Sequence, residues 1–184
     1  MKSRTRPERT MRSVTIIVPV KDEEIGLQYL LGEYRESSLN EDYDVNFIFV
    51  IDVRSSDSSK KYASEFSDSI IDQKETTGKG AAVRQAVEFW KNETSDFIIF
   101  LDADGSYSFT AVSMILSKLS EGSDVVSGSR FLSIRGRPEG MSRLHNFGNK
   151  FLSKASSIRN RRNISDLCTG LWGFSEKALK KLSI

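Results

Sequence analysis

The sequence has few of the residues that build disulfide-bonded or zinc-stabilised proteins. Its 184 residues include one cysteine, Cys168, and one histidine, His145. A single cysteine excludes an internal disulfide and suits a reducing compartment. His145 has no Cys or His partner at metal-ligand spacing, so we expect it to be structural. We expect Cys168 to be a small buried apolar residue.

Long apolar runs are also missing. No run approaches the ~20 residues that a membrane-spanning helix requires, and no signal-peptide core follows the basic N-terminus. We therefore expect a cytoplasmic protein. Residues 1–12 combine five basic residues with no apolar periodicity, which predicts a flexible basic arm. Residues 13–184 are enough for a single domain with a substantial core.

Acidic residues are nearly absent from one stretch in the last third of the chain. Between Arg130 and Arg162, nine Lys and Arg residues accompany a single acid, Glu139. Such asymmetry predicts an anionic partner for this stretch. The alternative is a solvated basic face of a helix.

Short apolar runs, by contrast, are present and alternate with segments of helical periodicity. The expected strands cover 14–20, 45–51, 70–71, 97–101 and 124–127, with a last strand or turn over 168–174. Helices are expected after a cap at Asp22, after Lys60, over 82–90, 110–120 and 147–158, and after a cap at Ser175, with a loop over 131–142. This alternation predicts an α/β architecture with a mainly parallel sheet.

The apolar run Phe97 to Leu101 is the best candidate for a strand buried on both faces. It stops at two carboxylates one residue apart, Asp102 and Asp104. Ligands of open α/β sheets bind at the carboxyl ends of strands, and Mg²⁺ and Mn²⁺ prefer oxygen ligands. The pair is therefore a candidate metal site, and a helix cap or acidic turn is the alternative.

The chain carries an internal control for this spacing. Asp42 and Asp44 are also one residue apart, but they precede a predicted strand instead of following one. We expect this second pair to lie in a solvated loop. Position in the fold, rather than spacing, distinguishes the two pairs.

Three predicted strands end in acids or Gly-rich turns, at Asp52, at Asp102, and at Gly128-Ser129-Arg130. Together with the segment from Val18 to Glu24, this ordered set resembles the motifs of family 2 glycosyltransferases, in particular the dolichol-phosphate mannosyltransferase and polyprenyl-phosphate glycosyltransferase branch. The resemblance runs from Val14 to Leu182. It implies the GT-A fold, a Rossmann-like α/β/α sandwich, and a nucleoside-diphosphate sugar donor such as GDP-mannose or UDP-glucose.

The resemblance also implies roles for individual residues. Its nucleotide-binding positions correspond here to Pro19, Asp22, Glu24, Asp52, Lys79 and Asp102. It implies that Asp102 and Asp104 hold Mg²⁺ or Mn²⁺ against the diphosphate, and that Arg130 and Arg143 bind phosphate. Asp166 falls beside the sugar or acceptor, so the implied catalytic set is Asp104, Asp166 and Arg130.

Several positions depart from the family pattern. Lys21-Asp22 replaces a Tyr-Asn type pair, and the second strand ends in Asp52-Val53-Arg54-Ser55 where Asp-Asp-Gly-Ser is usual. Ser58 replaces a Gly, and Ser106 follows the acidic pair. These changes leave the base and sugar of the donor open and affect the acidic pair less.

The basic stretch suggests the acceptor. Its charges are interleaved with apolar residues, namely Phe131, Leu132, Phe147, Phe151 and Leu152. This mixture suits a lipid phosphate, such as dolichyl or polyprenyl phosphate, at the cytoplasmic face of a membrane. A phosphate is already ionised and needs no general base, whereas a hydroxyl acceptor would require one, for which Asp166 is the candidate. The alternative for Asp166 is a cap or an ion pair with Arg161 or Arg162.

Three other functions fit part of the pattern. One is a retaining GT-A enzyme that acts on a small phosphorylated acceptor; the resemblance itself implies inversion. A sugar-phosphate nucleotidyltransferase is disfavoured, because residues 21–24 replace the Gly-rich, Arg-bearing loop it needs. A non-catalytic lipid- or RNA-binding module is the third, and no nucleic-acid motif supports it. The chain ends just after a predicted helix, so it is either a catalytic fragment or a short family member.

Overall fold

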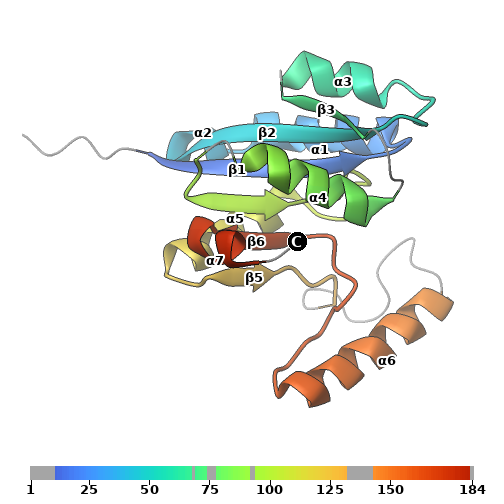
Figure 1. The fold of residues 1–184 in the computed structure, drawn as a ribbon, viewed down its shortest axis with the longest axis vertical. Coiled ribbons are helices and arrows are strands. Elements are labelled where there is room, and N and C mark those ends of the chain that lie inside the picture. Colours follow the sequence, from blue (N-terminus) through green and yellow to red (C-terminus); the bar gives the residue numbers. More distant parts are fainter. Residues whose placement is uncertain (1–10, 68, 74–77, 92–93, 132–142, 183–184) are drawn as a thin grey trace, which may run out of the picture.

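The computed structural model of the chain describes residues 11–67, 69–73, 78–91, 94–131 and 143–182, without the side chains of residues 143–146. Its centre is a six-stranded sheet in the order β3-β2-β1-β4-β6-β5 (Figure 1). The strands are β1 (Arg12–Val20), β2 (Tyr43–Asp52), β3 (Ile70–Gln73), β4 (Phe97–Phe100), β5 (Val125–Ser127) and β6 (Trp172–Ser175).

The sheet is parallel over its first four strands. β1 pairs in parallel with β2 and β4, and β2 with β3. β6 then runs antiparallel to both β4 and β5. The predicted α/β class with a mainly parallel sheet is confirmed. Because four parallel strands end at one edge, their carboxyl-terminal residues meet there.

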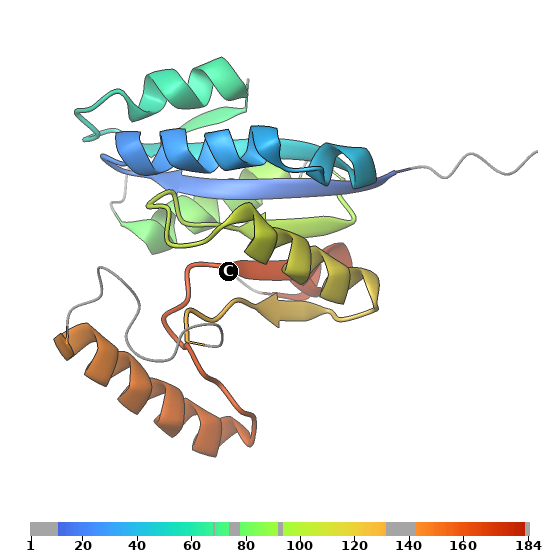
Figure 2. The ribbon, with the colours of Figure 1, turned by 180° about the vertical axis from the view of Figure 1, so that it is seen from behind.

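Helices cover both faces of this sheet. They are α1 (Glu24–Glu36), α2 (Leu39–Asp42), α3 (Ser59–Phe66), α4 (Lys79–Trp90), α5 (Phe109–Ser120), α6 (Arg143–Asn160) and α7 (Glu176–Lys181). α4 and α7 lie on one face, and α1 and α5 on the other (Figures 1 and 2). The layers form the expected α/β/α sandwich.

Alternate side chains of the central strands pack into two separate hydrophobic cores, one on each face of the sheet. Ile16 and Ile99 pack in the core under α1 and α5, while Ile17 and Ile98 pack under α4 and α7. All four side chains are fully buried. Burying one such side chain stabilises the fold by about 1.5–3 kcal/mol. The strand expected to be buried on both faces is therefore confirmed.

The start of α1 differs from the prediction. The apolar stripe of this helix, Leu27, Leu30, Leu31 and Tyr34, is buried as expected. Asp22, however, does not cap it, because Glu23 occupies the cap position without a side-chain cap bond. Asp22 adopts a left-handed φ of 51°, and its carboxylate accepts a hydrogen bond from the Ser56 backbone N–H, 2.7 Å away. The prediction of an Asp22 cap is wrong because this side chain is turned toward the loop after β2.

Three smaller predictions have mixed outcomes. Asp42 and Asp44 are exposed as expected, but they end α2 and open β2 rather than forming a loop. Cys168 is exposed rather than buried, because it lies with Leu167 in an exposed turn between buried residues. Ser175 caps α7 as predicted, and its side chain accepts a hydrogen bond from Ala178 N.

Helix α6 stands away from the sandwich and projects from its side (Figures 1 and 2). The loop expected over 131–142 lies outside the described residues except for Phe131. The basic arm lies outside them too, apart from Met11 and from Arg12, which is the first residue of β1. Within the described part of the chain, no helix combines the length and apolarity needed to cross a membrane.

Candidate active site

A cleft of about 220 Å³ opens at the carboxyl ends of the parallel strands. It is lined by Pro19, Val20, Lys21, Glu23, Asp52, Gln73, Gly78, Lys79, Ala82, Asp102, Ala103 and Asp104. The structure thus brings together Pro19, Asp52, Lys79, Asp102 and Asp104 from the predicted site. These residues come from four different elements and their ends, as expected for the ligand edge of a parallel sheet.

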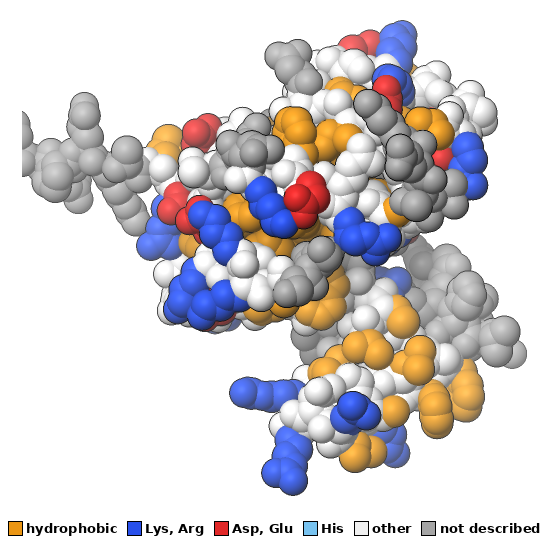
Figure 3. Space-filling view, in the orientation of Figure 1, with side chains coloured by type: hydrophobic (Ala, Val, Ile, Leu, Met, Phe, Trp, Pro, Cys, Tyr) orange, Lys and Arg blue, Asp and Glu red, His pale blue; other side chains and the backbone are white. Residues whose placement is uncertain are grey.

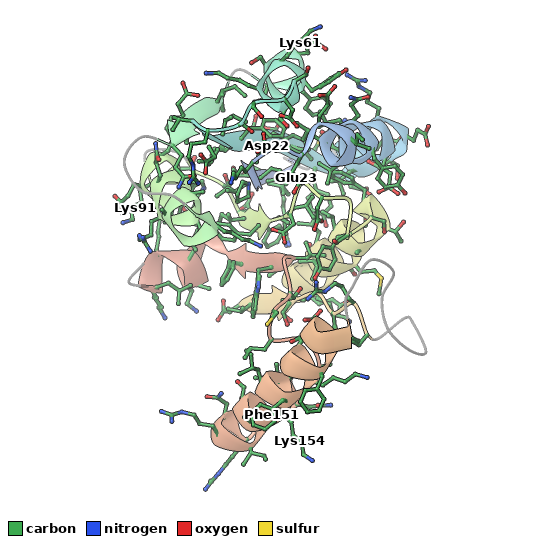
Figure 4. All side chains as sticks on the ribbon, turned by 90° about the vertical axis from the view of Figure 1, so that its right-hand side faces the viewer. Asp22, Glu23, Lys61, Lys91, Phe151 and Lys154 are labelled. Carbon is green, nitrogen blue, oxygen red and sulfur yellow. The ribbon has the colours of Figure 1, made fainter. Side chains whose placement is uncertain are left out.

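Asp22 and Glu24 do not line this cleft. Asp22 binds the Ser56 N–H, and the Glu24 carboxylate accepts from Ser58 N at 3.1 Å. Both acids therefore connect the start of α1 to the loop before α3. Glu23, which lies between them in sequence, is the acid that reaches the cleft, and Figure 4 shows it beside Asp22 between α1 and α4. No sequence pattern singles out Glu23, because only the turn at Asp22 decides which of the three acids faces the cleft.

The charge around Glu23 is unfavourable for another anion. Burial raises the pKa of Glu23, and the nearby carboxylates of Asp104 and Asp102 raise it further. A divalent cation near these three acids would relieve their repulsion. The electrostatics of the cleft therefore favour cation binding.

The segment that carries Asp102 and Asp104 is held closely on two sides. A Cβ at Gly26 of α1 would lie 2.9 Å from the Asp104 Cα, and a Cβ at Gly170 would overlap the Asp102 carboxylate. On the far side of Asp104, Gly105 takes a φ of 74° and the Asp104 carboxylate accepts from Ser106 N at 2.9 Å. Close packing and this tight turn together fix the two acids at the tip of β4.

The donor chemistry of this pair fits a hard divalent cation, since both residues offer carboxylate oxygens. Among the described residues, no group of three His, Cys, Asp or Glu side chains is arranged to hold a metal ion. The oxygens of a diphosphate could supply further ligands to a cation held by Asp102 and Asp104. Asp102 is also the partner of Lys79, whose Nζ forms an ion pair with its Oδ1.

Asp52, at the end of β2, is buried and paired with Arg54. The Arg54 Nε and Nη2 donate to the two carboxylate oxygens at 2.9 and 2.7 Å, and the Arg54 backbone N–H adds a third bond. These bonds hold the pKa of Asp52 well below its ordinary value. The arginine that departs from the family pattern thus keeps this acid ionised at the cleft wall.

A second polar cluster forms around Asp166. The Arg130 Nε and Nη2 donate to its two carboxylate oxygens at 2.8 and 3.0 Å, and Asn149 Nδ2 donates at 2.6 Å. The Asp166 side chain is fully buried, while 21% of the Arg130 side chain is exposed. The ion-pair partner of Asp166 is therefore Arg130, and not Arg161 or Arg162 as in the alternative considered above. The side chain of Arg143 lies outside what the structure describes.

The environment of Asp166 favours its ionised form. Burial alone would raise its pKa, but the hydrogen bonds from Arg130 and Asn149 outweigh this effect, so the pKa lies below the ordinary value. Asp166 is thus a weak proton acceptor in this arrangement and a firm anchor for the guanidinium. Asn149, which no sequence motif singles out, lies on α6 and connects that helix to the same carboxylate.

Tyr107 links this cluster to the cleft. Its hydroxyl lies 2.7 Å from Thr169 Oγ1 and accepts a hydrogen bond from Gly170 N at 3.0 Å. Gly170 in turn packs against Asp102. The segment from Asp166 to Gly170 therefore reaches from the Arg130 ion pair to the acidic pair, so the two predicted groups of site residues belong to one continuous region.

The layered fold and an acidic pair at the tip of the central strand define a nucleotide-sugar transferase type of domain. Residues 15–183 match the family model described as Glycosyl transferase family 2, and the chain belongs to this family. The predicted family and the predicted GT-A fold are confirmed. The narrower likeness to the dolichol-phosphate mannosyltransferase branch stays a prediction.

Individual relatives agree with this assignment. The chain is 28% identical over 175 residues to glycosyltransferase AglJ of Haloferax volcanii, covering 95% of this chain and 54% of that protein. Glucosyl-3-phosphoglycerate synthase of Mycobacterium tuberculosis, solved with Mn²⁺ and UDP-glucose, superposes with a TM-score of 0.69 at 16% identity, over 93% of this chain and 58% of that one. Its complex with phosphoglyceric acid gives a TM-score of 0.66 at 16% identity over 90% and 57%. The chain thus spans little more than half the length of these proteins.

Proposed function

We propose that this chain is the catalytic domain of a metal-dependent glycosyltransferase that moves a sugar from a nucleoside-diphosphate sugar to a phosphate-bearing acceptor. The observation that carries the proposal is the position of Asp102 and Asp104, which border a cleft together with Glu23, Asp52 and Lys79. Family membership supports it, as does the structural relative solved with Mn²⁺ and UDP-glucose.

Each group at the cleft has a chemical task in this reaction. A bound Mg²⁺ or Mn²⁺ would neutralise the charge that develops on the departing diphosphate. Asp102 and Asp104 would hold that ion. Lys79 and the N-terminal N–H groups of α4 favour phosphate at the same edge. Asp52 and Glu23 offer carboxylate oxygens that can accept hydrogen bonds from the nucleoside.

Arg130 is the best candidate for the group that binds the acceptor phosphate. Its guanidinium is oriented by Asp166 and remains partly exposed. A guanidinium held in one orientation loses less entropy when it binds phosphate. A phosphate acceptor also brings its own negative charge to the reaction, so in this proposal Asp166 positions Arg130 and need not remove a proton.

Helix α6 supports a lipid-linked phosphate as the acceptor, of the dolichyl or polyprenyl type. Hydrophobic side chains gather on the visible face of this helix, with Lys and Arg side chains toward its C-terminal end (Figure 3). Phe147, Phe151 and Ile158 are 72%, 66% and 72% exposed, and residues 143–162 include no acid. In our proposal this helix lies on an anionic membrane surface, where each basic residue adds about 1 kcal/mol of attraction.

A small phosphorylated acceptor is the second candidate. The structural relative solved with phosphoglyceric acid favours it, and Arg130 would serve either acceptor. The two candidate acceptors differ in the role they assign to α6. A lipid-linked acceptor explains the exposed phenylalanines of this helix as a membrane contact, whereas a small acceptor does not explain them.

One thermal-shift panel tests the donor side. We expect UDP or GDP and their sugars to raise the melting temperature only with Mn²⁺ or Mg²⁺ present, and we expect D102N and D104N to lose this response. An unchanged melting temperature with every nucleotide and metal would contradict the proposal. Transfer assays with the donor identified in this way then compare a polyprenyl phosphate with phosphoglycerate as the acceptor. Labelled sugar in the butanol phase would identify the lipid acceptor, and labelled product in water would identify the small one.

A further inference from the structure

Lys79 forms an ion pair with Asp102, one of the two carboxylates proposed to hold the metal. Its ammonium pairs with Asp102 Oδ1, although the two residues come from the start of α4 and the tip of β4. About half of the Lys79 side chain (54%) and 28% of the Asp102 side chain are exposed. The ion pair is therefore reachable from solvent and lies on the wall of the cleft.

The backbone around Lys79 directs it to this position. Gly78 adopts a φ of 100°, a conformation that side-chain-bearing residues rarely take. The Gly78 carbonyl accepts a hydrogen bond from the buried Gln73 side chain at 3.2 Å. This turn starts α4 at the cleft, so that its first side chain extends toward Asp102.

Asp102 has little freedom to turn away from Lys79. Its other carboxylate oxygen, Oδ2, packs against Gly170 so closely that a Cβ there would overlap it. The loop that carries Gly170 is fixed in turn by Tyr107. Gly170 therefore crowds one oxygen of this carboxylate, and Lys79 contacts the other.

We therefore expect Lys79 and a divalent cation to compete for Asp102. The two positive charges would also repel each other at this carboxylate. A nucleoside diphosphate changes this balance, because its phosphates give the ammonium a new anionic partner next to the N-terminus of α4. Lys79 can then leave Asp102 without losing its ionic contact.

We propose that Lys79 is a resident cation that makes metal binding at Asp102 conditional on the nucleotide diphosphate. The inference deepens the proposed function and rests on it. The linkage is reciprocal, so nucleotide raises metal affinity by the same factor by which metal raises nucleotide affinity. In the free protein, Lys79 suppresses adventitious metal binding.

The test measures Mn²⁺ binding by electron paramagnetic resonance and calorimetry, with and without UDP or GDP. In the wild type we expect weak Mn²⁺ binding that tightens about 5- to 150-fold with nucleotide, the usual range of coupling between sites. In K79M we expect Mn²⁺ to bind the nucleotide-free protein about tenfold more tightly, with a smaller further gain on adding nucleotide.

Two further variants make the result specific. K79R keeps a cation at this position and should retain the wild-type coupling. K21M removes another lysine that lines the same cleft and should leave the nucleotide-free Mn²⁺ affinity near that of the wild type. Circular dichroism checks the fold of each variant, and the exposed position of Lys79 predicts little change.

Each result has a definite consequence. Equal Mn²⁺ affinity of nucleotide-free K79M and wild type would overturn the role of Lys79, while a wild type that still binds metal with nucleotide would keep the proposed function. If nucleotide-free K21M gained as much Mn²⁺ affinity as K79M, the loss of any positive charge at the cleft would explain the effect. That result would also overturn the inference. A wild type that binds no metal under any condition would overturn both proposals.

Discussion

The Arg130 guanidinium and the Asp166 carboxylate meet at two points, with Nε and Oδ2 2.8 Å apart and Nη2 and Oδ1 3.0 Å apart. The two residues are 36 positions apart in sequence, and Asn149 of α6 donates to the same carboxylate. A buried acid thus fixes the direction of a partly exposed arginine beside the cleft. Through Asn149, helix α6 is attached to this pair.

Replacing Asp166 by Asn should weaken both the fold and acceptor binding. The neutral amide leaves Arg130 without its counter-charge, which we expect to lower the free energy of unfolding by about 2 kcal/mol, less than for a fully buried pair because Arg130 is 21% exposed. We expect a higher KM for the acceptor with little change in nucleotide affinity. Urea unfolding and steady-state kinetics measure these effects, and D44N, at an exposed acid, is the control.

The kcat of D166N distinguishes a positioning role of Asp166 from a role as general base. If Asp166 acted as a general base, kcat in the wild type would fall as its carboxylate became protonated, and D166N would lose almost all kcat at every pH. In our proposal, D166N keeps a measurable kcat at saturating acceptor, and R130K shows the same rise in KM. A kcat in D166N at the level of the uncatalysed reaction would refute the positioning role.

Low pH should reduce the difference in unfolding free energy between the wild type and D166N. The pKa of Asp166 is lowered in the folded state, so its contribution is complete above the unfolded value of about 3.9 and is lost as pH falls through the folded value. The amide that replaces this carboxylate in D166N does not titrate. We therefore expect the difference in unfolding free energy to be constant from pH 7 to about pH 5 and to shrink at lower pH. Parallel urea titrations at each pH measure it, and a difference that grows toward acid pH would contradict the assignment.

Adding a methyl group at Gly170 should disturb the metal site without unfolding the domain. The new Cβ would overlap the Asp102 carboxylate, so this side chain must leave its present position. We expect G170A to lose most of the thermal shift produced by nucleotide and Mn²⁺. G32A is the matched control, because a Cβ at this α1 residue would meet no atom within 4 Å apart from the neighbouring backbone of its own helix. An unchanged thermal shift in G170A would show that the position of Asp102 is not critical.

Membrane binding by α6 can be tested with variants in which neutral glutamines replace its basic residues. We expect K150Q/K154Q/R159Q to lose binding to vesicles that contain phosphatidylserine, since three interactions of about 1 kcal/mol are removed. K61Q/K91Q/K118Q makes the same change in net charge elsewhere; Figure 4 shows Lys61 and Lys91 far from Phe151 and Lys154. Equal vesicle binding by the wild type and both triple variants would exclude α6 as the membrane-binding surface and favour the small acceptor.

Much of the architecture could be predicted from the sequence because burial imposes periodicity. The apolar run from Phe97 to Leu101 predicts a fully buried strand, and the spacing of apolar residues from Leu27 to Tyr34 predicts a helix buried on one face. Both are buried in this way in the structure. The exposure of Cys168 could not be predicted in this way. A run of mixed small and apolar residues is compatible with either a strand or a surface turn, and contacts with Asn149 and Tyr107 hold it as a turn.

The sequence by itself determined the fold class, the family and the acidic pair that follows the central strand, because strand periodicity and motif order are local properties of the chain. Only the tertiary structure decided that Glu23 faces the cleft and not its neighbours Asp22 and Glu24. It also decided that Asp166 pairs with Arg130 and that Lys79 meets Asp102. Such pairings depend on backbone turns and on the close approach of separate elements, which no local pattern of residues specifies.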